Sequence, residues 1–419
     1  GRAVEALTTR AARPRTHKKH VHVIPPPVHA LKEPTRFLKQ SIPLILHATL
    51  FGFMLAVHYM TNAFDGPIYF LLLLGAYLLL FKFSDRFFLA VATTGVSFGL
   101  FALPFSLFFK PFASGIGVNC APAFLVKLVK VGPFLFEKGN CQVSPPWMLL
   151  VLWGFYLVSL ILFVYVMFRD KPGKNRDQDT IPLLLFMLGF FLISIPEFFY
   201  IKDIYPQHFR ANTMFKLGYQ AFMMMGIASA YVFYRISVMQ ANGKYLLKAI
   251  YLFFFVLVFI YPFYSVPSYY GKLDKMPQLD GQKWIADSYP HDSELIQYLN
   301  TRVSGQPVIL EAQGDSYTDY ERISSFTGLP TVAGWWVHEW LWRGNADVVG
   351  SRIPEINDLY QSPDLELTRA LISKYKIKYV VVSSLEREKY KDLNEKKFEQ
   401  LGKKIFTSSN GIGALYQVN

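Results

Sequence analysis

Long apolar stretches separated by short polar segments fill the chain between residues 41 and 266. An α-helix needs roughly 20 apolar residues to cross the hydrocarbon of a bilayer. About seven runs approach this length, at 41–60, 67–81, 87–109, 147–168, 181–200, 213–234 and 245–266. The pattern predicts a helical multi-pass membrane domain over residues 41–266, with the short second run as its weakest span.

Residues 267–419 have shorter apolar runs and a balanced charge, with 18 Lys and Arg against 20 Asp and Glu. The runs PVILEA (307–312) and KYVVVSS (378–384) are typical of buried strands, and LELTRALISKYKI (365–377) has the apolar spacing of a helix. The Asn-Gly pair in KIFTSSNGIGALYQV favours a hairpin. We therefore predict a small folded α/β domain over residues 267–419.

The composition agrees with a membrane protein, because 52% of the residues are apolar and 17% are aromatic. Residues 1–40 carry nine Lys and Arg against two Glu, a net charge of +7 out of +13 for the whole chain. This segment has no apolar core of a signal peptide, and a basic flank beside a first span indicates a cytoplasmic tail or linker rather than a nucleic-acid-binding surface. Since the chain begins without Met, we expect further sequence before it.

Lys and Arg also indicate the orientation of the spans. With the tail inside, the basic loops 82–86, 169–180 and 235–244 lie inside as well, as the positive-inside rule requires. An odd number of spans then puts residues 267–419 on the outer face of the cell membrane. The loop that follows the fifth run, 197–212, lies on that same face.

Both cysteines, Cys120 and Cys141, fall in the outer loop 110–146. An oxidising compartment would permit a disulfide between them, and the alternative is two unrelated thiols. The same loop contains AFLVKLVKVGPFLF (123–136), whose apolar and Lys residues are spaced as in a helix along the membrane interface. We expect an interfacial or re-entrant helix there rather than a full span.

The sixth run carries polar residues where hydrocarbon should begin. Asn212, Lys216 and Gln220 recur every four residues and form one stripe of a helix, and Arg210 comes just before it. One interpretation is an anion site, in which a helix N-terminus, Arg210 and Lys216 hold the phosphate of a lipid. The other is that Lys216 extends to the interface and Arg210 pairs with an acidic residue or a lipid phosphate.

Two acidic residues lie near this stripe. Glu197 ends the fifth run and Asp203 follows six residues later. Either carboxylate could ligate a divalent metal or act as a general base, which makes both weak catalytic candidates. The alternative is that they neutralise Arg210 and Lys216.

An aromatic segment at 311–344 holds four of the seven tryptophans within eight residues. It is either a platform for a glycan acceptor, a membrane-docking surface or part of the domain core. The candidate acceptor-binding residues are Glu311, Tyr317, Tyr320, Arg322, Trp336, His338, Glu339 and Arg343. HEWLW lacks the second His of a zinc-protease helix, and no Cys/His metal cluster, Gly-rich phosphate loop or nucleophile elbow is present in the sequence.

Three blocks resemble a known family. PEFFYIKDIYPQHFRANTMFKLGYQAF, GQPVILEAQGDSYTDYERISSFTGLPTVAGWWVHEWLWRG and YKIKYVVVSSLEREKY are similar to the YYY-type multi-pass membrane proteins, which are grouped by fold with the GT-C glycosyltransferases. The resemblance covers most of residues 41–419. It implies a GT-C-like fold and sugar transfer from a polyprenyl-phosphate donor, with the donor phosphate near Arg210, Asn212 and Lys216. The catalytic acidic loop of that class would lie in the missing N-terminal region.

The leading hypothesis is therefore the C-terminal portion of a membrane glycosyltransferase. Its expected partners are membrane lipid, a polyprenyl-phosphate-linked sugar and a glycan or protein acceptor, with a divalent metal as a conceivable cofactor. Two alternatives remain open, a transporter or flippase for an anionic lipid or glycan and a non-catalytic glycan-binding scaffold. A transporter would place charged residues deep in several spans.

Overall fold

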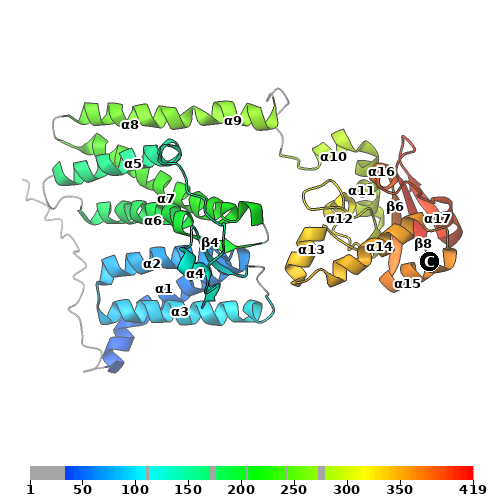
Figure 1. Ribbon diagram of the computed structural model, residues 1–419, viewed down its shortest axis with the longest axis horizontal. Coiled ribbons are helices and arrows are strands. Elements are labelled where there is room, and N and C mark those ends of the chain that lie inside the picture. Colours follow the sequence, from blue (N-terminus) through cyan, green and yellow to red (C-terminus); the bar gives the residue numbers. More distant parts are fainter. Residues whose placement is uncertain are drawn as a thin grey trace, which may run out of the picture. The chain divides into compact units, whose positions relative to one another are not determined.

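The computed structural model describes residues 34–109, 113–169, 176–203, 206–240, 243–271 and 279–418. Within these ranges, six helices are long and apolar enough to cross a membrane. They are Lys39–Thr61, Asp85–Ser106, Pro146–Arg169, Gln178–Phe198, Ala211–Val238 and Lys244–Tyr270. The short second run forms a helix of 17 residues, Asp65–Phe81. The predicted fold class, a multi-pass helical membrane domain with a small α/β part, is confirmed (Figure 1).

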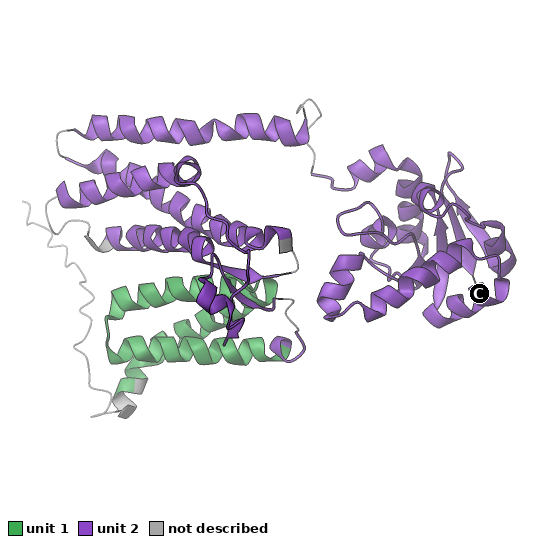
Figure 2. Cartoon of the chain, viewed as in Figure 1, with its two compact units in different colours: residues 1–104 green, residues 105–419 purple. Residues whose placement is uncertain are grey.

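The chain divides into two compact units, residues 1–104 and 105–419 (Figure 2). The first contains α1 (Pro34–Thr61), α2 (Asp65–Phe81) and most of α3 (Asp85–Ser106). Thr94 of α3 joins these three helices, because its hydroxyl lies 3.1 Å from the Tyr77 hydroxyl of α2 and donates to the Ala48 carbonyl of α1 at 3.3 Å. These hydrogen bonds satisfy the buried polar groups inside an otherwise apolar bundle.

The membrane-spanning part of the second unit comprises α5 (Pro146–Arg169), α6 (Arg176–Phe198), α7 (Ala211–Val238), α8 (Lys244–Phe259) and α9 (Tyr261–Tyr270). Helices α6 and α7 approach each other closely at Gly189. A Cβ at this position would come within 2.5 Å of Met225 Cγ, so only glycine fits without a shift. The buried face of α7, which includes Leu217, Ala221 and Ala228, packs into this part of the bundle.

A small four-stranded sheet forms from the loop before α5 and the segment after α6. Its strands are β1 (Gly115–Val118), β2 (Lys130–Val131), β3 (Phe134–Leu135) and β4 (Phe199–Lys202), in the order β2-β3-β1-β4. Because β4 continues directly from α6, its antiparallel pairing with β1 ties the loop before α5 to the end of α6. Gly117 of β1 leaves room for the Tyr200 ring, which a Cβ would meet at 2.0 Å.

The prediction of an interfacial or re-entrant helix over residues 123–136 is wrong. Only one turn forms, α4 (Ala123–Val126), and β2 and β3 follow as an antiparallel hairpin. The reason is the Gly132-Pro133 pair between them, since Gly132 adopts a left-handed φ of 57° and proline cannot donate to a helical hydrogen bond.

The C-terminal domain, residues 279–418, contains a sheet in the order β5-β6-β8-β7. Its strands are β5 (Val308–Leu310), β6 (Ile377–Val382), β7 (Gly402–Thr407) and β8 (Ala414–Val418); β5 and β6 are parallel and the other pairs antiparallel. The strands and hairpin expected from sequence lie at these positions. Helix α15 (Leu365–Tyr375) matches the helix expected there, with Asp364 capping its first turn.

Both faces of this sheet are covered by helices. Along β6, Val380 and Val382 belong to a cluster with α14 (Asp347–Gln361), α15 and α17 (Lys396–Leu401), and Val381 belongs to a cluster with α11 (Pro290–Arg302) on the other face. The remaining helices are α10 (Lys283–Ser288), α12 (Arg322–Thr327), α13 (Trp336–Arg343) and α16 (Ser384–Lys389). A strand buried on both faces explains the unbroken run of valines.

Candidate functional site

A buried polar cluster lies where α5 begins, α6 ends and α7 begins. We call Ser144, Glu197 and Arg210 the Glu197 cluster. The Arg210 Nη1 donates to Glu197 Oε2 at 2.9 Å and its Nη2 donates to Ser144 Oγ at 3.0 Å. Ser144 donates to Glu197 through both its amide (2.9 Å) and its hydroxyl (2.7 Å). Both carboxylate oxygens are thus engaged within the protein.

The sequence positions these three groups at the ends of helices. Glu197 occupies the last turn of α6, Arg210 precedes the first residue of α7, and Ser144 precedes the Pro145-Pro146 pair that starts α5. The Arg210 side chain is only 8% exposed and that of Glu197 is 14% exposed. A buried charge is retained at low cost only when it is paired and hydrogen-bonded, as here.

A disulfide and two hydrogen bonds hold the loop before α5, which contains Cys120 and Cys141, against this cluster. A disulfide joins the two cysteines, 21 residues apart in sequence. Beside it, the Asn119 side-chain amide donates to the Gln142 carbonyl at 2.7 Å and to the Glu197 carbonyl at 2.9 Å. Crosslinking the loop and bonding it to the α6 backbone restrict the position of Ser144.

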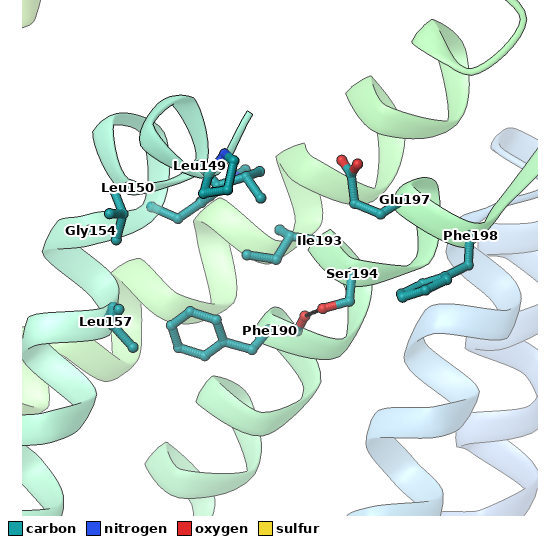
Figure 3. A pocket seen from close by; sticks show the side chains of 11 residues that line it. Leu149, Leu150, Gly154, Leu157, Phe190, Ile193, Ser194, Glu197 and Phe198 are labelled. Carbon is teal, nitrogen blue, oxygen red and sulfur yellow. Dashed lines mark hydrogen bonds between the residues drawn. The ribbon is translucent and has the colours of Figure 1, made fainter. Parts of the chain in front are cut away.

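An apolar groove of about 460 Å³ runs between α5 and α6, and Glu197 lies at one end of it (Figure 3). Its lining is almost entirely hydrocarbon, with Ser194 as the other polar side chain. The Ser194 hydroxyl donates to the Phe190 carbonyl of its own helix at 2.8 Å. The apolar lining includes Leu149, Leu150, Trp153, Leu157, Phe190 and Ile193. Such a groove in a membrane-spanning bundle fits a hydrocarbon chain.

The polar stripe predicted on α7 is present but does not line this groove. Gln220 is buried, and Asn212 and Lys216 are half-buried on the same stretch of helix. Arg210, predicted as the fourth phosphate-binding residue, pairs with Glu197. Asp203, the other weak catalytic candidate, is half-buried just beyond β4. Lys216, half-buried on α7, is the remaining cation of the predicted set.

A second buried ion pair joins the opposite ends of α6 and α7, and sequence reasoning missed it. Arg235 donates from Nε to Asp179 Oδ1 at 2.7 Å and from Nη2 to Oδ2 at 3.0 Å, and Tyr231 donates to Oδ1 at 2.8 Å. In the sequence, Arg235 falls in the basic loop 235–244 that indicates the orientation of the spans. Its spacing of four from Tyr231 on one helix face is the signal that could have indicated a shared partner.

In the C-terminal domain, two predicted acceptor-binding residues are buried. Glu311 accepts hydrogen bonds from the amides of Ile323 (2.9 Å) and Ser324 (3.1 Å) at the start of α12. Arg322 pairs with the buried Asp292 of α11. An exposed glycan platform would require both at the surface, whereas here they join elements inside the domain.

The other predicted acceptor-binding residues are partly buried or exposed. Tyr320 and Trp336 are partly buried against the core. Tyr317 is exposed, and His338, Glu339 and Arg343 belong to α13, where Glu339 and Arg343 form an ion pair. Within the described residues, no group of three or more His, Cys, Asp or Glu could hold a metal ion.

Three buried glutamates surround the carboxyl ends of β5 and β6. Burial raises the pKa of Glu311 to about 7, and burial raises the pKa of Glu321 to about 9. Burial also raises the pKa of Glu386, whose carboxylate accepts the amides of Ala312 (3.0 Å) and Ser383 (2.9 Å). Burial therefore shifts the pKa of each of the three acids upward from that of a free carboxyl group.

Glu321→Gln is expected to stabilise the C-terminal domain at pH 8 and to leave it nearly unchanged at pH 4. Because the pKa of Glu321 is raised from 4.5 to about 9 on folding, the wild type loses stability as pH rises through this window, and glutamine does not titrate. Glutamine can also keep the bond from the Gly314 amide, which now reaches Glu321 Oε1 at 2.6 Å. Thermal unfolding followed by tryptophan fluorescence measures this, since five of the seven tryptophans lie beyond residue 283.

Glu355→Gln is the matched control. Lys374 and Tyr375 bond to Glu355 and hold the pKa of this carboxyl below its usual range despite partial burial, so its replacement gives no stabilisation at pH 8. If Glu321→Gln differed from the wild type in unfolding temperature by the same amount at pH 4 and at pH 8, Glu321 would be ionised in the folded domain at pH 8.

Comparison with known families matches a model described as an uncharacterized membrane protein (DUF2298) over residues 166–225. The matched segment runs from the end of α5 through α6 and β4 into α7, and includes Asp179, Glu197, Arg210 and Lys216. Among curated proteins, none matches. Together with the six candidate spans, the match shows a multi-pass membrane protein.

Proposed function

We propose that this chain is the C-terminal portion of a membrane glycosyltransferase that transfers a sugar from a polyprenyl-phosphate donor at the outer face of the membrane. One observation carries the proposal: the apolar groove between α5 and α6 ends at a polar cluster, beside the helix that bears Lys216. A hydrocarbon chain fits the groove, and a phosphate at its end would lie near the N-terminus of α7, where the helix dipole favours an anion.

The disulfide supports the location of the proposed site on the outer face of the membrane. Cys120 and Cys141 lie in the loop that pairs with β4 after α6, and disulfides persist in oxidising compartments. If α7 and the continuous helix Lys244–Tyr270 each cross the membrane, the C-terminal domain returns to the same face as the disulfide. Its extracytoplasmic location is part of this proposal.

The chemistry proposed is displacement at the anomeric carbon. The acceptor hydroxyl oxygen forms a bond to that carbon and gives its proton to a general-base carboxylate, for which no residue of this chain is assigned. The bond from the carbon to the phosphate oxygen breaks, and the leaving phosphate carries away the negative charge. A cation beside the departing oxygen stabilises this charge as it develops. We assign that role to Lys216, with Asn212 as a hydrogen-bond donor. Arg210 is engaged by Glu197 and is not assigned to the phosphate. The oxygens of Glu197 are occupied by Ser144 and Arg210, so Glu197 is not assigned as the general base.

The transporter alternative gains no support from the buried charges. Asp179 and Arg235 lie inside the bundle, but their side chains are 3% and 2% exposed and satisfy each other. Charges that line a substrate path face a water-filled cavity. This pair instead closes the interior between α6 and α7.

Lys216→Met is expected to lower the transfer rate about 10- to 100-fold, because one charge-assisted hydrogen bond contributes roughly 1.5–3 kcal/mol. The assay follows a radiolabelled sugar from polyprenyl phosphate to acceptor with the complete protein in nanodiscs. Lys244→Met, at the start of α8, is the control that removes a half-buried lysine at a different helix end. Equal rates for Lys216→Met and the wild type would refute the assignment of the phosphate to this helix.

The groove can be tested separately with Gly154→Leu. A Cβ at Gly154 meets no atom within 4 Å, so leucine fills the groove without a backbone clash. Gly226→Leu on α7 is the matched control, because a Cβ there is equally unobstructed. We expect weaker binding of polyprenyl phosphate only in Gly154→Leu.

A further inference from the structure

Three aromatic rings form a connected group on the C-terminal domain. Tyr317 lies in the loop after β5, and Trp335 and His338 lie at the start of α13. The ring centroids are 5.9 Å apart for Tyr317 and Trp335, 5.3 Å for Tyr317 and His338, and 5.4 Å for Trp335 and His338. We call these three residues the aromatic triad.

Hydrogen bonds fix two of the three rings. Ser316 Oγ lies 2.7 Å from His338 Nδ1, and Trp335 Nε1 donates to the Tyr320 carbonyl at 3.2 Å. With Nδ1 engaged by Ser316, Nε2 is the nitrogen of His338 that can meet a ligand. The rings are therefore oriented before any ligand arrives, which lowers the entropy cost of binding.

Tyr317 is held in a conformation that burial does not explain. Its backbone has a left-handed φ of 65°, which is unfavourable for a non-glycine residue, and the residue is 80% exposed. A core tyrosine would recover such a cost through buried area. Strain at an exposed aromatic residue indicates a functional constraint on this loop.

Polar groups with both donors and acceptors adjoin the triad. Glu339 accepts the Gly334 amide at 3.3 Å and the Arg343 guanidinium at 2.5 Å, and the side chains of this ion pair are 25% and 42% exposed. The pair has no net charge, so an isolated anion gains little by binding here. A purely hydrocarbon ligand would leave Glu339, Arg343 and His338 partly desolvated without new partners.

We propose that the aromatic triad, with Glu339 and Arg343, is a binding site for a pyranose ring of a neutral glycan. The apolar C–H face of the sugar stacks on Tyr317 and Trp335, and its hydroxyl groups bond to His338 Nε2 and to the Glu339–Arg343 pair. The choice of a sugar as the ligand rests on the proposed function, whereas the orientation of the rings does not.

The test is saturation-transfer NMR on the full chain in nanodiscs, with maltotriose, mannotriose and chitotriose as probes. We expect transfer to the ring protons of at least one trisaccharide, and binding at least ten-fold weaker in Tyr317→Asn. Asparagine tolerates the left-handed backbone, so this variant removes the ring while it relieves strain. Its unfolding temperature is therefore expected to be unchanged or higher. Tyr269→Ala, which removes an exposed tyrosine of α9, is the control.

The outcomes separate this inference from the proposed function. No transfer to any of the three trisaccharides would overturn the sugar site, even if Lys216-dependent glycosyl transfer were measured. Conversely, binding that depends on Tyr317 would support the site even if no transfer activity existed. Quenching by brominated lipids that is reduced in Trp335→Phe, with no effect of the trisaccharides, would identify the triad as a membrane-docking surface instead and would also overturn it.

Discussion

Asp179→Leu is expected to lower the free energy of unfolding of the membrane-spanning part by about 3–5 kcal/mol, because it leaves Arg235 buried without its counter-charge. Arg235 has no aqueous alternative in the structure, since its side chain is 2% exposed between α6 and α7. Tyr231 also loses the acceptor of its hydroxyl. The measurement is unfolding in mixed micelles by titration with SDS, followed by the circular dichroism of the helices.

The double variant Asp179→Leu/Arg235→Met separates lost charge pairing from lost packing. Replacing both partners by apolar residues of similar volume removes the uncompensated charge, so most of the stability should return. Arg169→Met is the control for removing an exposed arginine at the end of α5, and a change within about 0.5 kcal/mol is expected. If Asp179→Leu unfolded at the wild-type midpoint, the pair would contribute nothing to the fold.

The helices of the membrane-spanning part could be predicted from the sequence, whereas the Asp179–Arg235 pair between them could not. Span lengths follow from hydropathy over about 20 residues, and the predicted runs agree with the helices because each segment must satisfy its own backbone in the bilayer. The pairing of Asp179 with Arg235 spans 56 residues, and no local pattern reports it. Both residues lay at the ends of predicted spans, where exposed loop charges are common.

The same limit applies to the C-terminal domain. Short apolar runs located β5 and β6, and the Asn-Gly turn signal located the final hairpin, because each is encoded within about ten residues. The burial of Glu311 and Arg322 depends on α12 and on Asp292, which lies 30 residues before its partner. The small sheet before α5 was missed since strands of two to four residues carry no detectable period.

At the candidate site, sequence spacing located the polar stripe of α7 but left the partner of Arg210 open. Neutralisation by Glu197 was one of two interpretations, and the structure supports it through a 2.9 Å contact. The groove between α5 and α6 could not be anticipated, because its shape depends on side chains from two helices about 40 residues apart in sequence. Arg210 is therefore less available to a lipid phosphate than its charge in the sequence indicates.

Glu197→Ala is expected to be the most damaging substitution at the site. It leaves the buried Arg210 unpaired, at a cost of about 3–5 kcal/mol, and removes the acceptor of both Ser144 hydrogen bonds. We expect a lower unfolding midpoint and faster hydrogen exchange at the Ser144 amide, measured by mass spectrometry of peptides covering residues 140–149. Ser194→Ala, one turn earlier on α6, removes a hydroxyl bonded within its own helix and serves as the control.

The double variant Glu197→Gln/Arg210→Gln determines whether the cluster is a scaffold or an anion site. Two neutral amides can bond to each other and to Ser144, so the unfolding midpoint should recover. If Lys216 holds the donor phosphate, this variant binds polyprenyl phosphate as tightly as the wild type, because the removed charges cancelled. If Arg210 instead exchanges Glu197 for the phosphate on binding, affinity falls at least ten-fold while the fold stays intact, and the assignment of Arg210 to the scaffold is wrong. Binding measured by fluorescence anisotropy of a labelled polyprenyl phosphate distinguishes the two results.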